Sequence, residues 1–350
     1  MKSPRVEQQR AITLNDVAAR CGVSYQTVSR VINGAPDVAS ATRLRILKAV
    51  NDLGYRPNMT ARHLVSRRST VVGLVTFGTT LYGPSQIMIN VEEAAKAAGY
   101  SVMFAGLKQV NVEEIRRAVN KLCAYQVAGI LMHLPLEIDL RILQELCRNF
   151  PFVALDSDFG FVAHSVLVHQ DRASSTATNH LINLGHREIA YLRAPLLWRA
   201  ARLRYQGWLD ALKAACLPPG PCAEGDWTAV SGFEATLDLI KNHRGEFTAL
   251  VVANDQMALG AIRAFEENGI RVPADVSVVG FDDIPEAAFF RPPLSTVKQD
   301  FTAVGELGFQ CLITQWTGTS VSPKTYTVNP TFVERYSTSR PSRHGAKSLY

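Results

Sequence analysis

Between residues 70 and 336 the sequence alternates short apolar runs with segments of helical periodicity, and this alternation restricts the possible folds more than any other feature. Continuous Val, Ile and Leu runs bounded by helices are typical of parallel strands covered on both faces. Two such blocks predict an α/β body of two doubly wound subdomains, in which ligands bind beyond the carboxyl ends of the strands. The expected strands are 71–76, 100–105, 128–133, 152–155, 165–168, 188–192, 248–253 and 276–280, and the first block has expected helices near 85–98, 112–125 and 137–149.

A helix-turn-helix is predicted before this body, in the stretch TLNDVAARCGVSYQTVSRVIN that begins at Thr13. Apolar residues at i, i+3 and i+4 from Leu14 line one face of a first helix. Gly22 can adopt the positive φ of a sharp turn, and Ser24 is expected to cap a second helix. The outer face of that helix carries Tyr, Gln, Ser and Arg side chains, which are suited to reading bases in a major groove.

A third helix is expected to complete a small all-α head. Ser40 is its expected N-cap and Gly54 its expected end. We expect the apolar residues Leu44, Leu47, Val50 and Leu53 to face the first two helices.

The charge of the chain is concentrated in this head. Residues 1–70 contain 12 Lys and Arg against 4 Asp and Glu, whereas the other 280 residues contain 25 against 27. A basic module on a near-neutral body is typical of nucleic-acid binding. A membrane surface is the alternative partner, but no basic amphipathic helix with Trp or Phe on its apolar face is present.

The segment LNDVAARCGVSYQTVSRVIN resembles the DNA-reading element of the LacI/GalR family of transcriptional regulators. The matches GPSQI, ARLR, EGDW, VANDQMALGA, VSVVGFDD and VKQDF extend the resemblance over roughly residues 12–336. The resemblance implies a body of two periplasmic-binding-protein-like subdomains of type I, linked by several crossings, with an effector held between them. The head residues expected at DNA are Thr13, Leu14, Ser24, Tyr25, Gln26, Thr27, Ser29, Arg30 and Asn33.

The basic segment between head and body, YRPNMTARHLVSRRS, has two possible interpretations. Arg56 precedes a proline and is therefore biased to an extended conformation, and Asn58 can cap a helix that is too short to be stable alone. One interpretation is a flexible basic linker. The other, which the family resemblance favours, is a hinge helix that folds on DNA and inserts Leu64 into the minor groove, with Asn58 and Arg62 as further contacts.

Polar residues follow several of the predicted body strands. Asp156, Asn254 and Asp282 end strands, Ser85 opens the first body helix, and Arg204 lies in ARLRYQGW. Carboxylates and a guanidinium can orient sugar hydroxyls, which both donate and accept hydrogen bonds. These residues also have structural alternatives, because Asn254 and Asp282 could be helix N-caps and Trp227 could be an ordinary core residue.

The resemblance assigns effector contacts to a larger set of positions. These are Asp156, Arg204, Trp227, Asn254, Asp282, Gln299 and Phe301. The sequence departs from the family's galactoside-binding pattern at Phe77, His133, Val168, Trp198 and Ala200, where that pattern has Ser, Asn, Phe, Ser and Ser. At four of these five positions a small polar side chain of the pattern is replaced by a bulky or apolar one. The resemblance therefore does not identify the effector.

Several function classes lack support in the sequence. No G-x-G-x-x-G follows the first strand, and no P-loop, nucleophile elbow or H-E-x-x-H is present, so we expect neither an enzyme nor a cofactor. The six cysteines include no Cys-x-x-Cys pair, which argues against a structural metal. The start lacks an apolar signal region and no run of 18 apolar residues occurs, which predicts a cytoplasmic protein without a membrane span.

These observations predict a sugar-responsive transcriptional repressor. A homodimer would bind a pseudo-palindromic operator and a galactoside-like inducer would release it. The alternative is the same architecture controlled by another sugar or a nucleobase, possibly as a corepressor. The expected domains are a DNA-binding head (1–57), a hinge (58–69), an effector-binding and dimerisation body (70–336) and a disordered tail (337–350). The tail contains a single Leu and cannot form a coiled coil, so we expect no tetramer held together by a coiled coil of tails.

Overall fold

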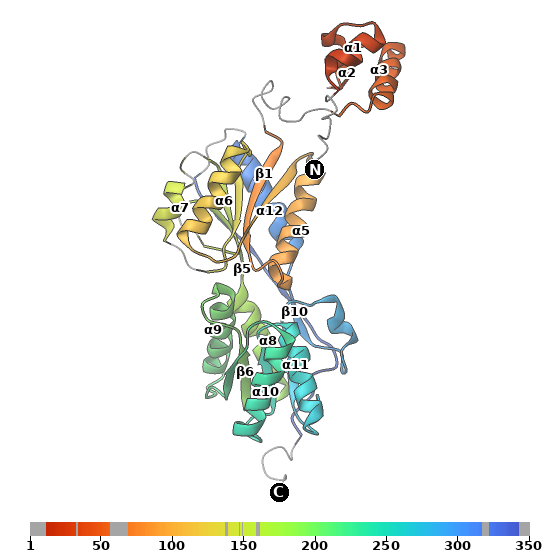
Figure 1. Cartoon of the computed structure of the whole chain (residues 1–350). Helices are drawn as coiled ribbons and strands as arrows, with labels where there is room; N and C mark the ends of the chain where they lie inside the picture. Colours follow the sequence, from red (N-terminus) through yellow and green to blue (C-terminus); the bar gives the residue numbers. More distant parts are fainter. Residues whose placement is uncertain are drawn as a thin grey trace, which may run out of the picture. The chain divides into compact units, whose positions relative to one another are not determined.

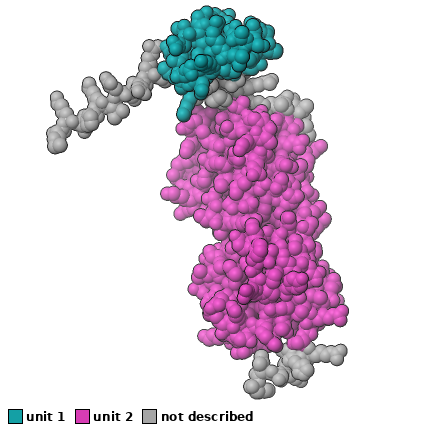
Figure 2. Space-filling model, turned by 90° about the vertical axis from the view of Figure 1, so that its right-hand side faces the viewer, with its two compact units in different colours: residues 1–68 teal, residues 69–350 magenta. Residues whose placement is uncertain are grey.

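The computed structural model describes residues 12–32, 34–56, 69–136, 139–146, 148, 150–158, 162–316 and 322–342. The chain forms two compact units, residues 1–68 and residues 69–350, which Figure 2 shows in different colours. Asn33 and the whole predicted hinge helix, with Asn58, Arg62 and Leu64, lie outside the described residues.

The head contains the predicted helix-turn-helix, formed by α1 (Leu14–Cys21) and α2 (Tyr25–Ile32). Thr13 caps α1 in a capping box: its hydroxyl accepts from the amide of Asp16, whose carboxylate accepts from the amide of Thr13. Gly22 has φ 63° at the turn, as expected. The hydroxyl of Ser24 accepts from the amide of Thr27 at 3.2 Å, which confirms Ser24 as the cap of α2.

The predicted core face of the third helix was half right: Val50 and Leu53 pack against the head core, whereas Leu44 and Leu47 do not. In α3 (Ser40–Asp52) Ser40 is the first helical residue and caps nothing, because the N-cap position is Ala39. Leu44 and Leu47 are 69% and 47% exposed, while Ile46 and Ala49 are buried. The stripe that faces α1 and α2 starts at Ile46 and follows the spacing i, i+3, i+4, so two leucines on the neighbouring face were mistaken for it.

The first body subdomain is a parallel six-stranded sheet in the order β11-β5-β4-β3-β1-β2. Side chains of α5 (Tyr82–Ala97) and α12 (Phe301–Trp316) pack on one face, and those of α6 (Val112–Ala124) and α7 (Leu140–Leu146) pack on the other (Figure 1). Adjacent residues of one strand therefore enter different cores, which explains why the strands are continuously apolar. The strands are β1 (Val71–Phe77), β2 (Ser101–Leu107), β3 (Ile130–His133), β4 (Phe152–Leu155), β5 (His164–Val168) and β11 (Thr325–Val328).

The second subdomain repeats this plan with a parallel four-stranded sheet in the order β7-β6-β8-β9. Helices α8 (Gln170–Leu184) and α9 (Arg199–Ala214) cover one face, and α10 (Ala229–His243) and α11 (Asp255–Glu267) cover the other (Figure 1). Its strands are β6 (Ile189–Arg193), β7 (Cys222–Glu224), β8 (Ala249–Val252) and β9 (Ser277–Val279), beside the antiparallel pair β10 (Thr296–Lys298) and β12 (Thr331–Val333) and the short 3-10 helix η1 (Pro285–Phe289).

The chain passes from one subdomain to the other after β5, after β10 and after β11. Hydrogen bonds link these crossings: the amide of His169 donates to the carbonyl of Val328 at 3.2 Å, and the side chain of Gln170 donates to that of Gln299 at 2.9 Å. The predicted pair of doubly wound subdomains is thereby confirmed, whereas the short strands β7, β10, β11 and β12 were not predicted.

The predicted disordered tail begins too early. The hydroxyl of Ser337 donates to the carbonyl of Val278 at 2.6 Å, and the amide of Val278 donates back to the carbonyl of Ser337 at 2.8 Å. His186 also contacts the carbonyl of Ser339 at 2.9 Å. Residues 337–342 are ordered because they satisfy the backbone groups at the free edge of β9; residues 343–350 lie outside the described residues. Among the helices that the structure describes, none is long and apolar enough to cross a membrane.

Candidate functional site

The outer face of α2 presents polar side chains to solvent. Tyr25 is 50% exposed, and Gln26 and Arg30 are also exposed, whereas Val28 and Val31 point into the head core. Arg30 forms an exposed ion pair with Asp37 at 3.2 Å. Because exposed ion pairs contribute little, the guanidinium is free to exchange Asp37 for a base or phosphate. Arg and Gln can bind base edges through two hydrogen bonds, so this face has the chemistry of major-groove readout.

The other predicted head residues have mixed positions. Thr13 and Ser24 are exposed caps, Thr27 is bonded to Ser24 at 2.9 Å, and Leu14 packs partly against the core. Their side chains therefore shape the helix-turn-helix, and the exposed caps and helix ends lie where backbone amides can meet phosphates.

A cavity lies between the two body subdomains, beyond the carboxyl ends of their strands. It brings together all the predicted effector residues except Ser85, whose hydroxyl instead donates to the carbonyl of Tyr82 at 2.7 Å inside α5. Ser85 lies one turn inside α5, because that helix begins at Tyr82 and not at the predicted residue 85. The lining residues are Leu81, Tyr82, Gly83, Pro84, Ile87, His133, Pro135, Asp156, Val168, Gln170, Trp198, Ala200, Arg204, Trp227, Asn254, Asp282, Gln299 and Phe301.

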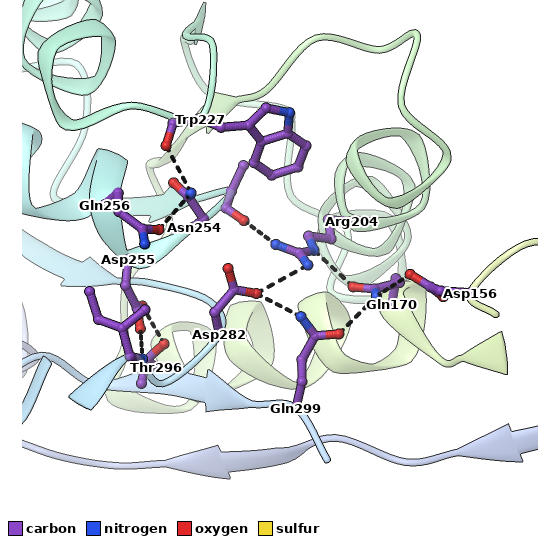
Figure 3. Close-up of polar contacts among 12 residues, drawn as sticks. Asp156, Gln170, Arg204, Trp227, Asn254, Asp255, Gln256, Asp282, Thr296 and Gln299 are labelled. Carbon is purple, nitrogen blue, oxygen red and sulfur yellow. Dashed lines mark hydrogen bonds and ion pairs between the residues drawn. The ribbon is translucent and has the colours of Figure 1, made fainter. Parts of the chain in front are cut away.

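Arg204, on α9, is the centre of the polar network in this cavity (Figure 3). Its Nε donates to Gln170 at 2.8 Å, its Nη1 to the carbonyl of Ala253 at 2.5 Å, and its Nη2 to Asp282 at 3.2 Å. The guanidinium also lies 3.7 Å from the centre of the Phe281 ring. A 4% exposed arginine held by these contacts presents a fixed positive charge.

Two glutamines extend the network across the crossings. Gln299 donates to Asp282 at 2.6 Å, and Gln170 donates both to Gln299 at 2.9 Å and to Asp156 at 3.1 Å. Gln170 was missed in the sequence, although it opens the helix after β5 and so obeys the same strand-end rule as Asp156. The network thus joins carboxylates of the first and second subdomains.

The structural alternative for Asn254 holds, whereas that for Asp282 does not. The side-chain oxygen of Asn254 caps α11 by accepting from Met257, and its amide donates to the carbonyl of Trp227 at 3.0 Å. Asp282 caps no helix; it has φ 112°, a region that non-glycine residues rarely adopt. The next residue, Asp283, has φ 54° and is fixed by Arg335 at 2.6 Å. Such strain is common at ligand sites.

Burial alters the ionisation of the cavity walls. It raises the pKa of Asp156 and of Asp282, while Arg199 beside the first and Arg204 beside the second act in the opposite direction. Behind Asp282, burial and the Asp282 charge raise the pKa of Asp255 to about 8. Burial lowers the pKa of His133 to about 4, so its imidazole is neutral at pH 7.

Aromatic side chains form the rest of the cavity. Trp198 packs between Phe77 and Trp227, with ring centres 5.6 Å apart in both pairs, and Tyr82 packs edge-on to Phe301 at 5.9 Å. The indole nitrogen of Trp227 is buried without a hydrogen-bond partner. Among the described residues no group of three His, Cys, Asp or Glu side chains could hold a metal. The arrangement suits a ligand with several hydroxyls and an apolar face.

Comparisons with known proteins agree with this description of the head and body. Residues 13–58 match the model of bacterial regulatory proteins of the lacI family, and residues 178–338 match a periplasmic binding protein-like domain. The chain is 39% identical over 305 residues to the lactose operon repressor of Escherichia coli (strain K12), covering 87% of this chain and 84% of that protein. It is 32% identical over 330 residues to the HTH-type transcriptional repressor PurR of Proteus mirabilis (strain HI4320), covering 93% of this chain and 96% of that protein.

Solved structures are similar over nearly the whole chain. The lac repressor dimer bound to operator and the anti-inducer ONPF has a TM-score of 0.87 and 38% identity, covering 94% of this chain and 100% of that one. A complex of the transcriptional regulator CelR with cellobiose has a TM-score of 0.70 and 30% identity, covering 93% and 99%.

Proposed function

The chain belongs to the LacI family of bacterial regulatory proteins, and we propose that it is a repressor released from operator DNA by a sugar bound between its body subdomains. Membership of the family makes it a DNA-binding transcriptional regulator and not an enzyme. The sugar, its inducing effect and the residues that contact it are the proposal.

The buried network around Arg204 is the observation that carries the sugar assignment. Arg204, Asp282 and Asp156 supply fixed donors and acceptors in one cavity, and Trp227 and Phe301 supply flat apolar surfaces. A sugar needs both, because its hydroxyls lie around a ring whose C–H face is apolar. The resemblance-based contacts Asn254, Gln299 and Phe301 also line this cavity, whereas Ser85 does not.

A nucleobase effector is the second candidate, because relatives named PurR match the chain at 31–33% identity. A planar base could stack on the indole of Trp227. Two buried carboxylates favour a ligand rich in hydroxyl donors over one whose edges are mostly acceptors. Trp198, which packs against Phe77, and Ala200 make the cavity less polar than the family's galactoside pattern, so we expect a weak response to simple galactosides.

In the proposed mechanism two heads read two half-sites of a pseudo-palindromic operator, which requires a dimer with twofold symmetry. We propose that the body supplies that dimer; the related lac repressor is a dimer in its complex with operator. Effector and operator prefer different arrangements of the two subdomains. Each must therefore weaken binding of the other by the same factor.

The operator is found first, by selecting bound sequences from random double-stranded DNA with the full chain. Fluorescence anisotropy on the selected DNA then gives affinities without effector and with galactose, isopropyl thiogalactoside, cellobiose or hypoxanthine. We expect at least one sugar to lower operator affinity tenfold or more. Tighter binding with hypoxanthine would support a nucleobase corepressor instead, and no response to a broad sugar panel would remove the sugar assignment.

Readout by the head has its own test on the same DNA. Gln26→Ala should cost about 1–3 kcal/mol at one preferred base pair and relax specificity there. Leu64→Ala should weaken operator binding and leave sugar affinity unchanged, if that leucine enters the minor groove as proposed. Equal loss on all DNA sequences for Gln26→Ala would mean that this side chain contacts only the backbone.

A further inference from the structure

Trp198 lies at the end of the loop between β6 and α9, as the N-cap residue of α9. Its indole leaves the second subdomain and packs against the first, with its ring centre 5.6 Å from that of Phe77. The contact with the neighbouring Gly78 is so close that a Cβ built there would lie 2.8 Å from the indole. Trp227 covers the other side at 5.6 Å.

The backbone around Trp198 holds this position. The amide of Arg199 donates across the cleft to the carbonyl of Pro135 at 2.8 Å, and Leu136 and Trp198 form an isolated antiparallel bridge. The guanidinium of Arg199 pairs with Asp156, also of the first subdomain, at 3.7 Å. On the other side Arg202 donates to the carbonyls of Leu196 and Leu197 at 2.9 and 3.1 Å. The middle of the loop and its junction with α9 are therefore held in place, and the indole is directed into the cleft.

The cavity that remains is small. Its free volume is about 60 Å³, whereas sites that bind small molecules usually offer about 300–1,000 Å³. The polar groups that would orient a ligand are all present and already bonded to one another. The cavity therefore lacks space for a ligand. Of the two tryptophans that line it, Trp198 is the half-buried one and contacts both subdomains.

We propose that the Trp198 indole is a built-in occupant of the effector cavity and thereby determines which effectors the protein accepts. An effector binds only by displacing the indole from between Phe77 and Trp227, so part of its binding free energy is used for that displacement. The indole also connects the two subdomains when no effector is present. This inference rests on the proposed function in taking the cavity as the effector site.

The test uses free indole as the probe, with the full chain on its selected operator. In Trp198→Ala, indole should bind with a stoichiometry of one and raise the thermal midpoint by several degrees. The operator affinity of this variant should differ several-fold from that of wild type, and added indole should return it to the wild-type value. Wild type should respond to indole in neither measurement. The control is Leu197→Ala, which changes an exposed side chain of the same loop and should behave as wild type.

The same variants test selectivity. Trp198→Ala should bind galactose and cellobiose at least tenfold more tightly than wild type does, measured by calorimetry. If Trp198→Ala is poorly folded by circular dichroism, Trp198→Phe replaces it and should show a smaller gain for the same sugars. A sugar that binds wild type and Trp198→Ala with equal affinity, or an operator affinity of Trp198→Ala that indole does not alter, would overturn the proposal. If indole acts on Trp198→Ala as expected but no sugar affects either protein, the sugar assignment fails and the role of Trp198 stands.

Discussion

The two walls of the cavity differ in chemistry. The wall from the second subdomain is charged and interlocked: Arg204 and Asp282 are 4% and 6% exposed and are bonded to each other and to their neighbours. The wall from the first subdomain is mainly apolar, with Leu81, Ile87 and Val168. Its His133 is neutral at pH 7, and Asp156 is the carboxylate it contributes.

This difference indicates that the two walls have different roles in effector binding. A buried network with fixed geometry orients a ligand at little further cost in entropy, since its side chains are already ordered. An apolar surface has no such geometry and tolerates small shifts of one subdomain against the other. We therefore expect changes in the charged wall to have larger effects than changes of similar size in the apolar wall.

The largest expected effect is that of Arg204→Met. The substitution leaves the Asp282 carboxylate buried without its cation, which should cost about 3–5 kcal/mol of unfolding free energy and abolish the response to effector. Urea denaturation measures the first effect and operator release the second. Arg263→Met, which removes an exposed pair with Glu267, should leave the unfolding free energy nearly unchanged. Equal costs for the two substitutions would show that the network adds nothing to stability.

The second expected effect is a pH dependence of the unfolding free energy that comes from Asp255, behind the charged wall. The pKa of Asp255 is about 8 in the folded chain and 3.8 ordinarily, so folding favours its protonated form. The stabilisation that protonated Asp255 contributes is complete below pH 3.8 and is lost as the pH rises to about 8. Over that range the unfolding free energy falls by up to about 1.4 kcal/mol per pH unit. Asp255→Asn should remove this slope from the unfolding free energy. A variant with the wild-type slope would assign the titration to another group.

The apolar wall should have the opposite pH dependence over a narrower range. The pKa of His133 is lowered from 6.5 to about 4, so its neutral form stabilises the fold above pH 6.5 and this is lost as pH falls toward 4. His133→Gln keeps a partner for Thr76, which lies 3.3 Å from the imidazole nitrogen. We expect its stability to fall less than that of wild type between pH 6.5 and 4, measured by denaturant titration at each pH. Parallel curves would show that the imidazole is solvated.

The smallest expected effect is that of Ile87→Val in the apolar wall. It removes one methylene from a side chain that is 3% exposed, which should cost about 0.5–1.5 kcal/mol and change effector affinity little. Chemical denaturation and sugar titration measure the two quantities. A loss of effector response as complete as that of Arg204→Met would remove the distinction between the walls.

Local features of the sequence were sufficient for the helix-turn-helix, the parallel strands and most of the site. The cap at Ser24 and the turn at Gly22 depend on residues within four positions of each other, and strand 152–155 was predicted with its observed bounds. Asp156 follows a strand of the first sheet and Asp282 a strand of the second, and within each sheet the carboxyl ends of the parallel strands lie at one edge. The position of these residues therefore follows from a local pattern and one topological rule.

Contacts between distant residues were decided only by the tertiary structure. Arg204 meets Gln170, Ala253 and Asp282 from three separate segments, and no local pattern specifies such a set. The same holds for Trp198, whose indole fills the cavity only because the first subdomain lies opposite it. Residues 337–342 are ordered by the free edge of β9, some 60 positions earlier in the chain. Periodicity and capping report on neighbours in sequence, whereas these features depend on which surfaces meet after the sheets have formed.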